Sequence, residues 1–181
     1  MGDSNTWPKW ATEAIEIEAW QPAWLTVASV QKTQLQEILA PFGITAIEHI
    51  GSTSIPGLAA KPVIDLITKA ISFEPIDAIN TSLSRHNWHY VSPEFDKRDY
   101  RRFFVKVIDD KRVAHLQILL SNSIQWEEQL LFKHRLLNDP VLAEAYANIK
   151  KECAEKHKND REAYTAAKSW FIQQVVRTPL Q

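Results

Sequence analysis

The chain has 181 residues, 45% of them hydrophobic, and a formal net charge of −1 at pH 7. This length is expected to form one domain, residues 1–181, with a sizeable core, and the composition excludes a disordered protein. The balanced charge argues against a general nucleic-acid binder, because such proteins are usually basic.

Cys153 is the sole cysteine of the sequence, so no intramolecular disulfide can form. The first ten residues lack the basic-then-apolar pattern of a signal peptide, and no apolar run approaches the length that spans a bilayer. These features predict a cytoplasmic protein with no membrane association. They leave the oligomeric state open.

The N-terminal part is predicted to hold a loose lead-in followed by a long helix. Residues 1–14 show no clear period, and we expect Trp7 and Trp10 to pack on the surface. Alternating apolar residues over 15–19 indicate a short edge strand or an extended segment. Helical spacing of apolar residues over 22–40, with a proline at the start, predicts an amphipathic helix.

The remaining chain is predicted to form strands first and helices last. We expect, in order, core strands at 44–50 and 63–67, a helix from Pro75 to about residue 86, a short strand at 88–91, and a hairpin of 102–108 and 112–120. Helices are expected beyond residue 123, with Asp139 and Asp160 as caps of the last two. The sequence by itself therefore supports an α+β or an α/β fold.

The loop between the two core strands combines groups that suit an anion. Residues 51–54 read Gly-Ser-Thr-Ser and offer backbone N–H groups and three hydroxyls with little bulk. Lys61 adds a mobile positive charge. Asp65 is the one ionisable side chain of the second core strand, and burying it is expensive unless it is paired or binds a metal. The alternative is a structural acid paired with Lys61 or with an arginine of the hairpin.

Residues 49–65, HIGSTSIPGLAAKPVID, resemble the signature of the GrpB-like family. The resemblance continues in residues 15–24, 112–118, 131–150 and 164–172, so it covers roughly the whole chain. It implies a nucleotidyltransferase-like fold, in which a mixed β-sheet is flanked by helices and the C-terminal third is helical.

The resemblance also implies a protein that binds a nucleotide or another phosphorylated small molecule and transfers a nucleotidyl group with Mg²⁺. Asp65 is then expected to hold the metal, and His49 or His115 to orient or deprotonate an acceptor. The phosphates are expected to contact Gly51, Ser52, Thr53, Ser54, Lys61, Arg112 and either Arg102 or Arg101.

Two Tyr–Lys pairs match the C-terminal pattern of the family, Tyr146 with Lys150 and Tyr164 with Lys168. A spacing of four places each pair on one helix face. They are expected either to line the cleft from the helical side or to be packed tyrosines with snorkelling lysines.

The sequence departs from the carboxylate pattern of a two-metal site. Such a site usually has two carboxylates separated by one residue on a strand, and Ile67 stands where the second would fall. His115 and Gln117, the candidates on a neighbouring strand, are not acidic, and the family tends to have a second histidine in place of Gln117. The alternative function is therefore a catalytically inactive nucleotide- or phosphate-binding domain.

Overall fold

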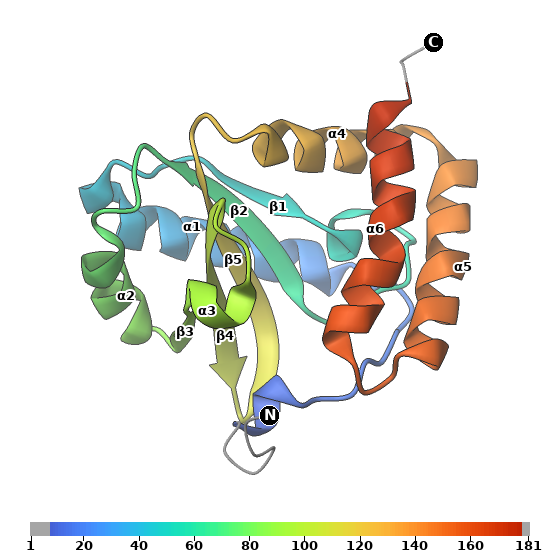
Figure 1. Cartoon of the computed structure of the whole chain (residues 1–181), viewed down its shortest axis with the longest axis horizontal. Coiled ribbons are helices and arrows are strands. Elements are labelled where there is room, and N and C mark those ends of the chain that lie inside the picture. Colours follow the sequence, from blue (N-terminus) through green and yellow to red (C-terminus); the bar gives the residue numbers. More distant parts are fainter. Residues whose placement is uncertain (1–7, 179–181) are drawn as a thin grey trace.

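The molecule is built on one five-stranded mixed sheet (Figure 1). The computed structural model describes residues 8–178 apart from the Arg161 side chain, and the prediction for Trp7 lies outside these residues. The strands are β1 (Ile47–Ile50), β2 (Ile64–Ala70), β3 (Trp88–Val91), β4 (Arg101–Ile108) and β5 (Lys111–Leu120), in the spatial order β1-β2-β5-β4-β3. β2 and β5 run parallel, and the other neighbours are antiparallel.

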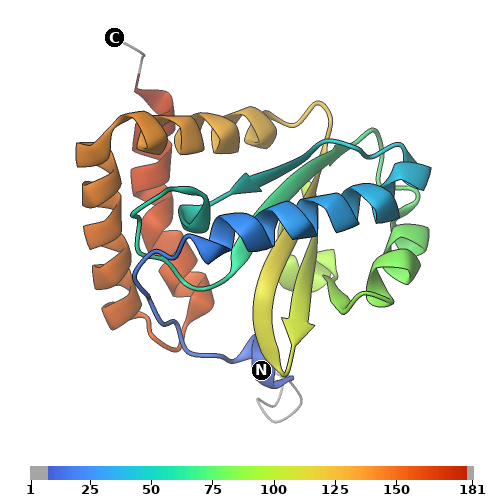
Figure 2. The ribbon, with the colours of Figure 1, turned by 180° about the vertical axis from the view of Figure 1, so that it is seen from behind.

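Helices lie on both sides of this sheet. They are α1 (Ala23–Leu39), α2 (Ile76–Ser84), α3 (Pro93–Asp96), α4 (Ile124–Asn138), α5 (Pro140–Lys156) and α6 (Arg161–Arg177). α1 and α2 cover one face, where the largest core cluster lies, and α4 to α6 form a group beside the other face (Figures 1 and 2). The predicted α+β class, with a helical C-terminal third, is confirmed.

Alternation along β2 and β5 decides which side chains reach each face. Leu66 and Leu116 point toward α1 and α2, where both are fully buried. Burying each leucine stabilises the fold by roughly 1.5–3 kcal/mol, which opposes any slip of the strand register. The parallel register pairs Asp65 with His115, so these two side chains share the opposite face.

Local sequence signals account for several element boundaries. The side chains of Asp139 and Asp160 each accept a backbone N–H bond of 2.9 Å at the start of α5 and α6, as expected of N-caps. Asp109 and Asp110 both have positive φ, 51° and 60°, at the turn of the predicted hairpin.

The segment over residues 15–19 is extended, and it stays outside the five-stranded sheet. Glu18 and Ala60 form an isolated bridge. Ile15 packs with Cys153 and Tyr164 of the C-terminal helices, which explains why the segment leaves the sheet edge. Among residues 8–178, no helix has both the length and the apolar character needed to cross a membrane.

Candidate functional site

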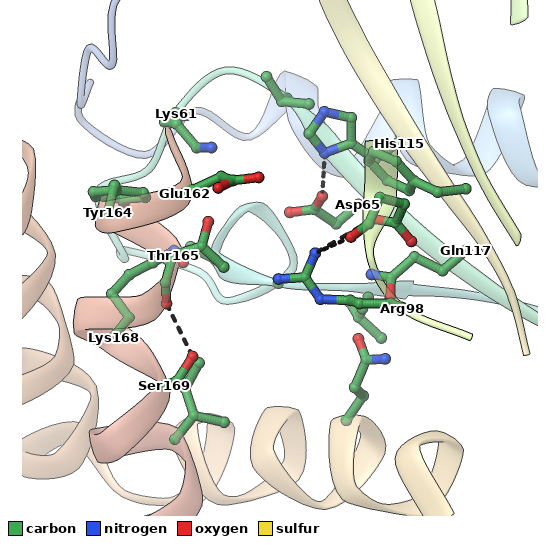
Figure 3. A pocket seen from close by; sticks show the side chains of 18 of the residues that line it. Lys61, Asp65, Arg98, His115, Gln117, Glu162, Tyr164, Thr165, Lys168 and Ser169 are labelled. Carbon is green, nitrogen blue, oxygen red and sulfur yellow. Dashed lines mark hydrogen bonds and ion pairs between the residues drawn. The ribbon is translucent and has the colours of Figure 1, made fainter. Parts of the chain in front are cut away.

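A cleft of about 1060 Å³ lies between the sheet and the C-terminal helices (Figure 3). It is lined by residues of β2, β4 and β5, by the loop between β1 and β2, by α3, and by α4, α5 and α6. Its volume is at the upper end of the range for small-molecule sites, about 300–1,000 Å³. The face of the sheet that carries Asp65 and His115 forms one wall.

Asp65 and His115 form a hydrogen-bonded pair on this wall. His115 Nδ1 lies 2.9 Å from Asp65 Oδ1, and the aspartate side chain remains 34% exposed to the cleft. Burial would raise the pKa of Asp65, but His115 and the nearby Lys61 and Lys168 outweigh it and hold that pKa below its ordinary value. Burial lowers the pKa of His115 despite the aspartate. A neutral imidazole that donates from Nδ1 to a carboxylate follows.

Gly51 makes room for the Asp65 carboxylate. A Cβ atom built on this glycine would lie 2.7 Å from Asp65 Oδ2, closer than real Cβ contacts allow. The glycine also has φ of 71°, which side-chain-bearing residues rarely adopt. The turn after β1 therefore requires glycine for the backbone and for the neighbouring carboxylate.

The hydroxyls predicted to cradle a phosphate are bonded within the protein. Thr53 Oγ1 lies 2.9 Å from His49 Nε2, and Ser54 Oγ donates to the Gly51 carbonyl at 2.7 Å. Thr53 and Ser54 are both buried. Ser52 lines the cleft, where its side chain is hydrogen-bonded to that of Tyr146. The loop thus joins β1 to the helical side of the cleft.

His49 does not share the face of Asp65. It pairs with Leu66 across β1 and β2, so its side chain points to the side covered by α1. Burial and the adjacent Lys133 lower the pKa of His49 to about 4, which keeps the ring neutral. Its hydrogen bond to Thr53 fixes the loop of residues 51–54 from the α1 side of the sheet. A role in contacting an acceptor has no support from this position.

The three candidate arginines of the hairpin are placed differently from one another. Arg102 faces the α2 side, where its guanidinium lies 4.0 Å from the Phe73 ring centroid, so it does not line the cleft. Arg112 lines the cleft, and its Nε donates to the Trp10 carbonyl at 2.7 Å. Arg101 also lines the cleft, because it alternates with Arg102 along β4.

Arg101 belongs to an ion-pair network that sequence reasoning missed. Its guanidinium donates to both carboxylate oxygens of Asp96, at 2.6 and 2.8 Å, and to Gln117 Oε1 at 2.7 Å. Arg98 reaches the same carboxylate at 3.3 Å and extends into the cleft (Figure 3). The short helix α3 that carries Asp96 lies between the predicted strand at 88–91 and the predicted hairpin, where no helix was expected. The high density of charged residues over 96–102 is the sequence feature that could have indicated this network.

Three lysines gather on the helical side of the cleft. Lys168 Nζ lies 4.0 Å and Lys61 Nζ 5.2 Å from the centroid of the same Tyr164 ring. Lys150 is buried, donates to the Ala59 carbonyl, and lies 5.0 Å from the Tyr146 ring centroid. Both Tyr–Lys pairs thus line the cleft, as one of the two sequence interpretations expected.

The Lys150 ammonium contacts a carbonyl and a tyrosine ring, and the Lys168 ammonium contacts a tyrosine ring. Within residues 8–178, no carboxylate lies within 4.0 Å of the Lys150 or Lys168 ammonium. Burial, together with Lys168 and Lys61, lowers the pKa of Lys150 to about 7. Burial and Lys61 lower the pKa of Lys168 to about 7 as well. The environment of the cleft therefore disfavours the protonated form of Lys150 and Lys168.

Replacing Lys150 with methionine is expected to make the stability of the fold less dependent on pH. The pKa of Lys150 in the folded chain, near 7, lies below that of a lysine in the unfolded chain. The folded chain therefore binds fewer protons than the unfolded chain between pH 7 and about 10. Because of this difference, the free energy of unfolding rises with pH by up to about 1.4 kcal/mol per unit. Lys150→Met should remove the contribution of Lys150 to this pH dependence. Urea unfolding at pH 7 and pH 9 measures it, with the exposed Lys151→Met as control; equal slopes in both variants would contradict the assignment.

The residues present do not fit a Mg²⁺ site of the two-metal type. Among the described residues, no three His, Cys, Asp or Glu side chains are grouped so that they hold a metal ion. Ile67 occupies the second carboxylate position and is fully buried in an apolar cluster. Asp65 is bonded to His115, and Asp96 to Arg101.

Comparison with known sequences points to one family. The sequence model described as GrpB protein matches residues 14–178. The UPF0157 protein YqkA of Bacillus subtilis (strain 168) is 29% identical over 158 residues, and the glutamate-rich protein GrpB of Alkalihalophilus pseudofirmus is 27% identical over 156. These matches cover 87% and 84% of the present chain. They span 45% of YqkA and 88% of the second relative.

Comparison with solved structures agrees. The crystal structure of conserved protein GrpB from Enterococcus faecalis superimposes with a TM-score of 0.79 at 29% identity, over 90% of this chain and 95% of that one. The structure of the GLD-2/RNP-8 complex gives a TM-score of 0.55 at 13% identity, over 84% of this chain and 59% of that one. The second likeness is one of fold alone.

Proposed function

The chain belongs to the GrpB protein family, and from that premise we propose that its cleft binds a phosphorylated small molecule such as a nucleotide. The observation that carries this proposal is the gathering of Lys61, Lys150 and Lys168 at one end of the cleft, over two tyrosine rings. Arg98 approaches the same space from the sheet side (Figure 3).

The energetics of the lysines favour an anionic ligand. Ammonium groups that share a partly closed cleft repel one another, and burial removes the water that would solvate them. The lowered pKa values of Lys150 and Lys168 are the result. A phosphate with two negative charges would supply the missing counter-charge through charge-assisted hydrogen bonds. The unliganded cleft thus carries an unfavourable charge distribution that such a ligand relieves.

Binding is proposed here without two-metal nucleotidyl transfer. That activity needs metal ions held by several carboxylates, and no three His, Cys, Asp or Glu side chains of the described residues are grouped so that they could hold one. The alternative drawn from the sequence, a nucleotide- or phosphate-binding domain, therefore agrees better with the residues that line the cleft. A cytoplasmic location, where phosphorylated metabolites abound, remains a prediction from the sequence.

Calorimetry of the whole chain tests this proposal. We expect at least one of inorganic phosphate, pyrophosphate, ATP, CTP, GTP and UTP to bind, in EDTA or in MgCl₂. Lys168→Met should weaken that binding by roughly 10- to 100-fold, because a hydrogen bond to a charged group contributes about 1.5–3 kcal/mol. Lys151→Met removes an exposed charge from the face of α5 outside the cleft and should change affinity less than twofold.

Two results would contradict the proposed function. One is the absence of binding for every compound of the panel in both buffers. The other is an equal loss of affinity in Lys168→Met and Lys151→Met, because that would indicate attraction to the general surface charge and not to the cleft.

A further inference from the structure

We infer that the cleft takes its phosphate ligand as the metal-free anion, with lysines in the place that Mg²⁺ has in metal-dependent nucleotide sites. This inference rests on the proposed function and names the form of its ligand, a phosphate ester or polyphosphate with two or more uncompensated negative charges. Mg²⁺ then competes with the protein for the same phosphate oxygens.

The carboxylates of the sheet wall are committed to other partners. Asp65 Oδ1 is bonded to His115, so this carboxylate can offer a ligand at most its Oδ2. Asp96, with a side chain only 5% exposed, receives two bonds from Arg101 and a third contact from Arg98. Mg²⁺ in nucleotide sites is usually held by one or two carboxylates in addition to the phosphates, in nearly ideal octahedral geometry. Among the described residues, no three His, Cys, Asp or Glu side chains are grouped so that they could complete a metal site around Asp65.

The lysines of the cleft, once protonated on binding, can provide the positive charge that a metal would provide. Lys61 and Lys168 lie above one tyrosine ring, within 5.2 Å of its centroid, and both are close enough to Lys150 to lower its pKa. A phosphate that arrives with a bound Mg²⁺ brings two positive charges beside these three. The same oxygens that the ammonium groups would contact are then occupied by the metal. The complexed ligand is therefore attracted less strongly than the free anion.

Replacing Asp65 is expected to change the affinity in opposite directions for metal-dependent and for metal-free binding. As a metal ligand it would be required, and Asp65→Asn would abolish binding. As a negative charge near the phosphate site it opposes the free anion, and its removal should strengthen binding about fivefold. Asparagine keeps the shape of the side chain and an oxygen that can accept the His115 Nδ1–H bond.

The test uses ATP and inorganic tripolyphosphate as probes of the whole chain, by calorimetry in EDTA and in millimolar MgCl₂, with sodium chloride matching the ionic strength. We expect both probes to bind in EDTA and the apparent Kd to rise about tenfold or more with Mg²⁺. Tighter binding of ATP than of tripolyphosphate would add a contact to the nucleoside within the same metal-free mode. Asp65→Asn should bind both probes more tightly in EDTA.

Binding that appears only with Mg²⁺, or that is lost in Asp65→Asn while the unfolding transition is intact, would overturn the inference and leave the proposed function standing. Absence of binding in both buffers would overturn both. The comparison of buffers uses the unaltered chain, so it decides the question even where the variant fails to fold.

Discussion

Raising the pH from 7 to 9 is expected to weaken phosphate binding by up to roughly tenfold per pH unit for each lysine that takes up a proton on binding. Burial lowers the pKa of Lys150 and Lys168 to about 7, so above this pH the unliganded cleft holds both amines largely neutral. A bound phosphate favours the charged form and raises the pKa of each. The complex must then recruit protons from solution, and their activity falls as the pH rises.

Two measurements check this pH dependence. Calorimetry at pH 7, 8 and 9 gives the slope of log Kd, and titrations at pH 8 in buffers of different ionisation enthalpy give the number of protons taken up. Lys168→Met should lower the slope by about one, because one titrating amine has been removed. Affinity that stays constant from pH 7 to 9, or a net release of protons, would show that these lysines do not contact the ligand.

Gly51→Ala is expected to lower the free energy of unfolding by about 2–4 kcal/mol, with two separate causes. The backbone there has φ of 71° and ψ of −175°, a region that essentially only glycine occupies and that strains an alanine by roughly 1–3 kcal/mol. The new Cβ would also lie 2.7 Å from Asp65 Oδ2, so the carboxylate must move away from its place beside His115. Urea unfolding monitored by tryptophan fluorescence measures the loss.

Gly57→Ala is the matched control for this loss. Gly57 has a comparable φ of 81°, but a Cβ built there meets nothing within 4 Å. Its replacement should therefore show strain from a positive φ without any steric contact, and a larger loss in Gly51→Ala is expected from the carboxylate contact. Equal destabilisation of both glycine variants would mean that Asp65 is free to move and that the Gly51 contact has no effect on stability.

Much of the fold could be predicted from local signals. Gly and Pro bound the short apolar runs of β1 and β2, and the aspartates at 139 and 160 cap α5 and α6 as expected. Asp65 was identified because a lone carboxylate in an apolar strand is costly to bury without a partner. These properties depend on residues close together in the chain, so the sequence contains them.

The identity of the partner groups depended on long-range packing. The sequence offered Lys61, an arginine or a metal as the partner of Asp65, and the parallel pairing of β2 with β5 selected His115. Strand register also decided that Arg101 and not Arg102 lines the cleft.

Long-range packing also decided the contacts of the loop at residues 51–54 and of the cleft lysines. The hydroxyls of residues 51–54 are attractive phosphate ligands in isolation, and only their position against His49 and Tyr146 shows that they are already bonded. The sequence by itself determined the strands, the caps and the unusual aspartate. Only the tertiary structure decided which charges meet, because α5 and α6 carry Lys150 and Lys168 back onto a loop far earlier in the chain, and electrostatic interactions depend on distance in space.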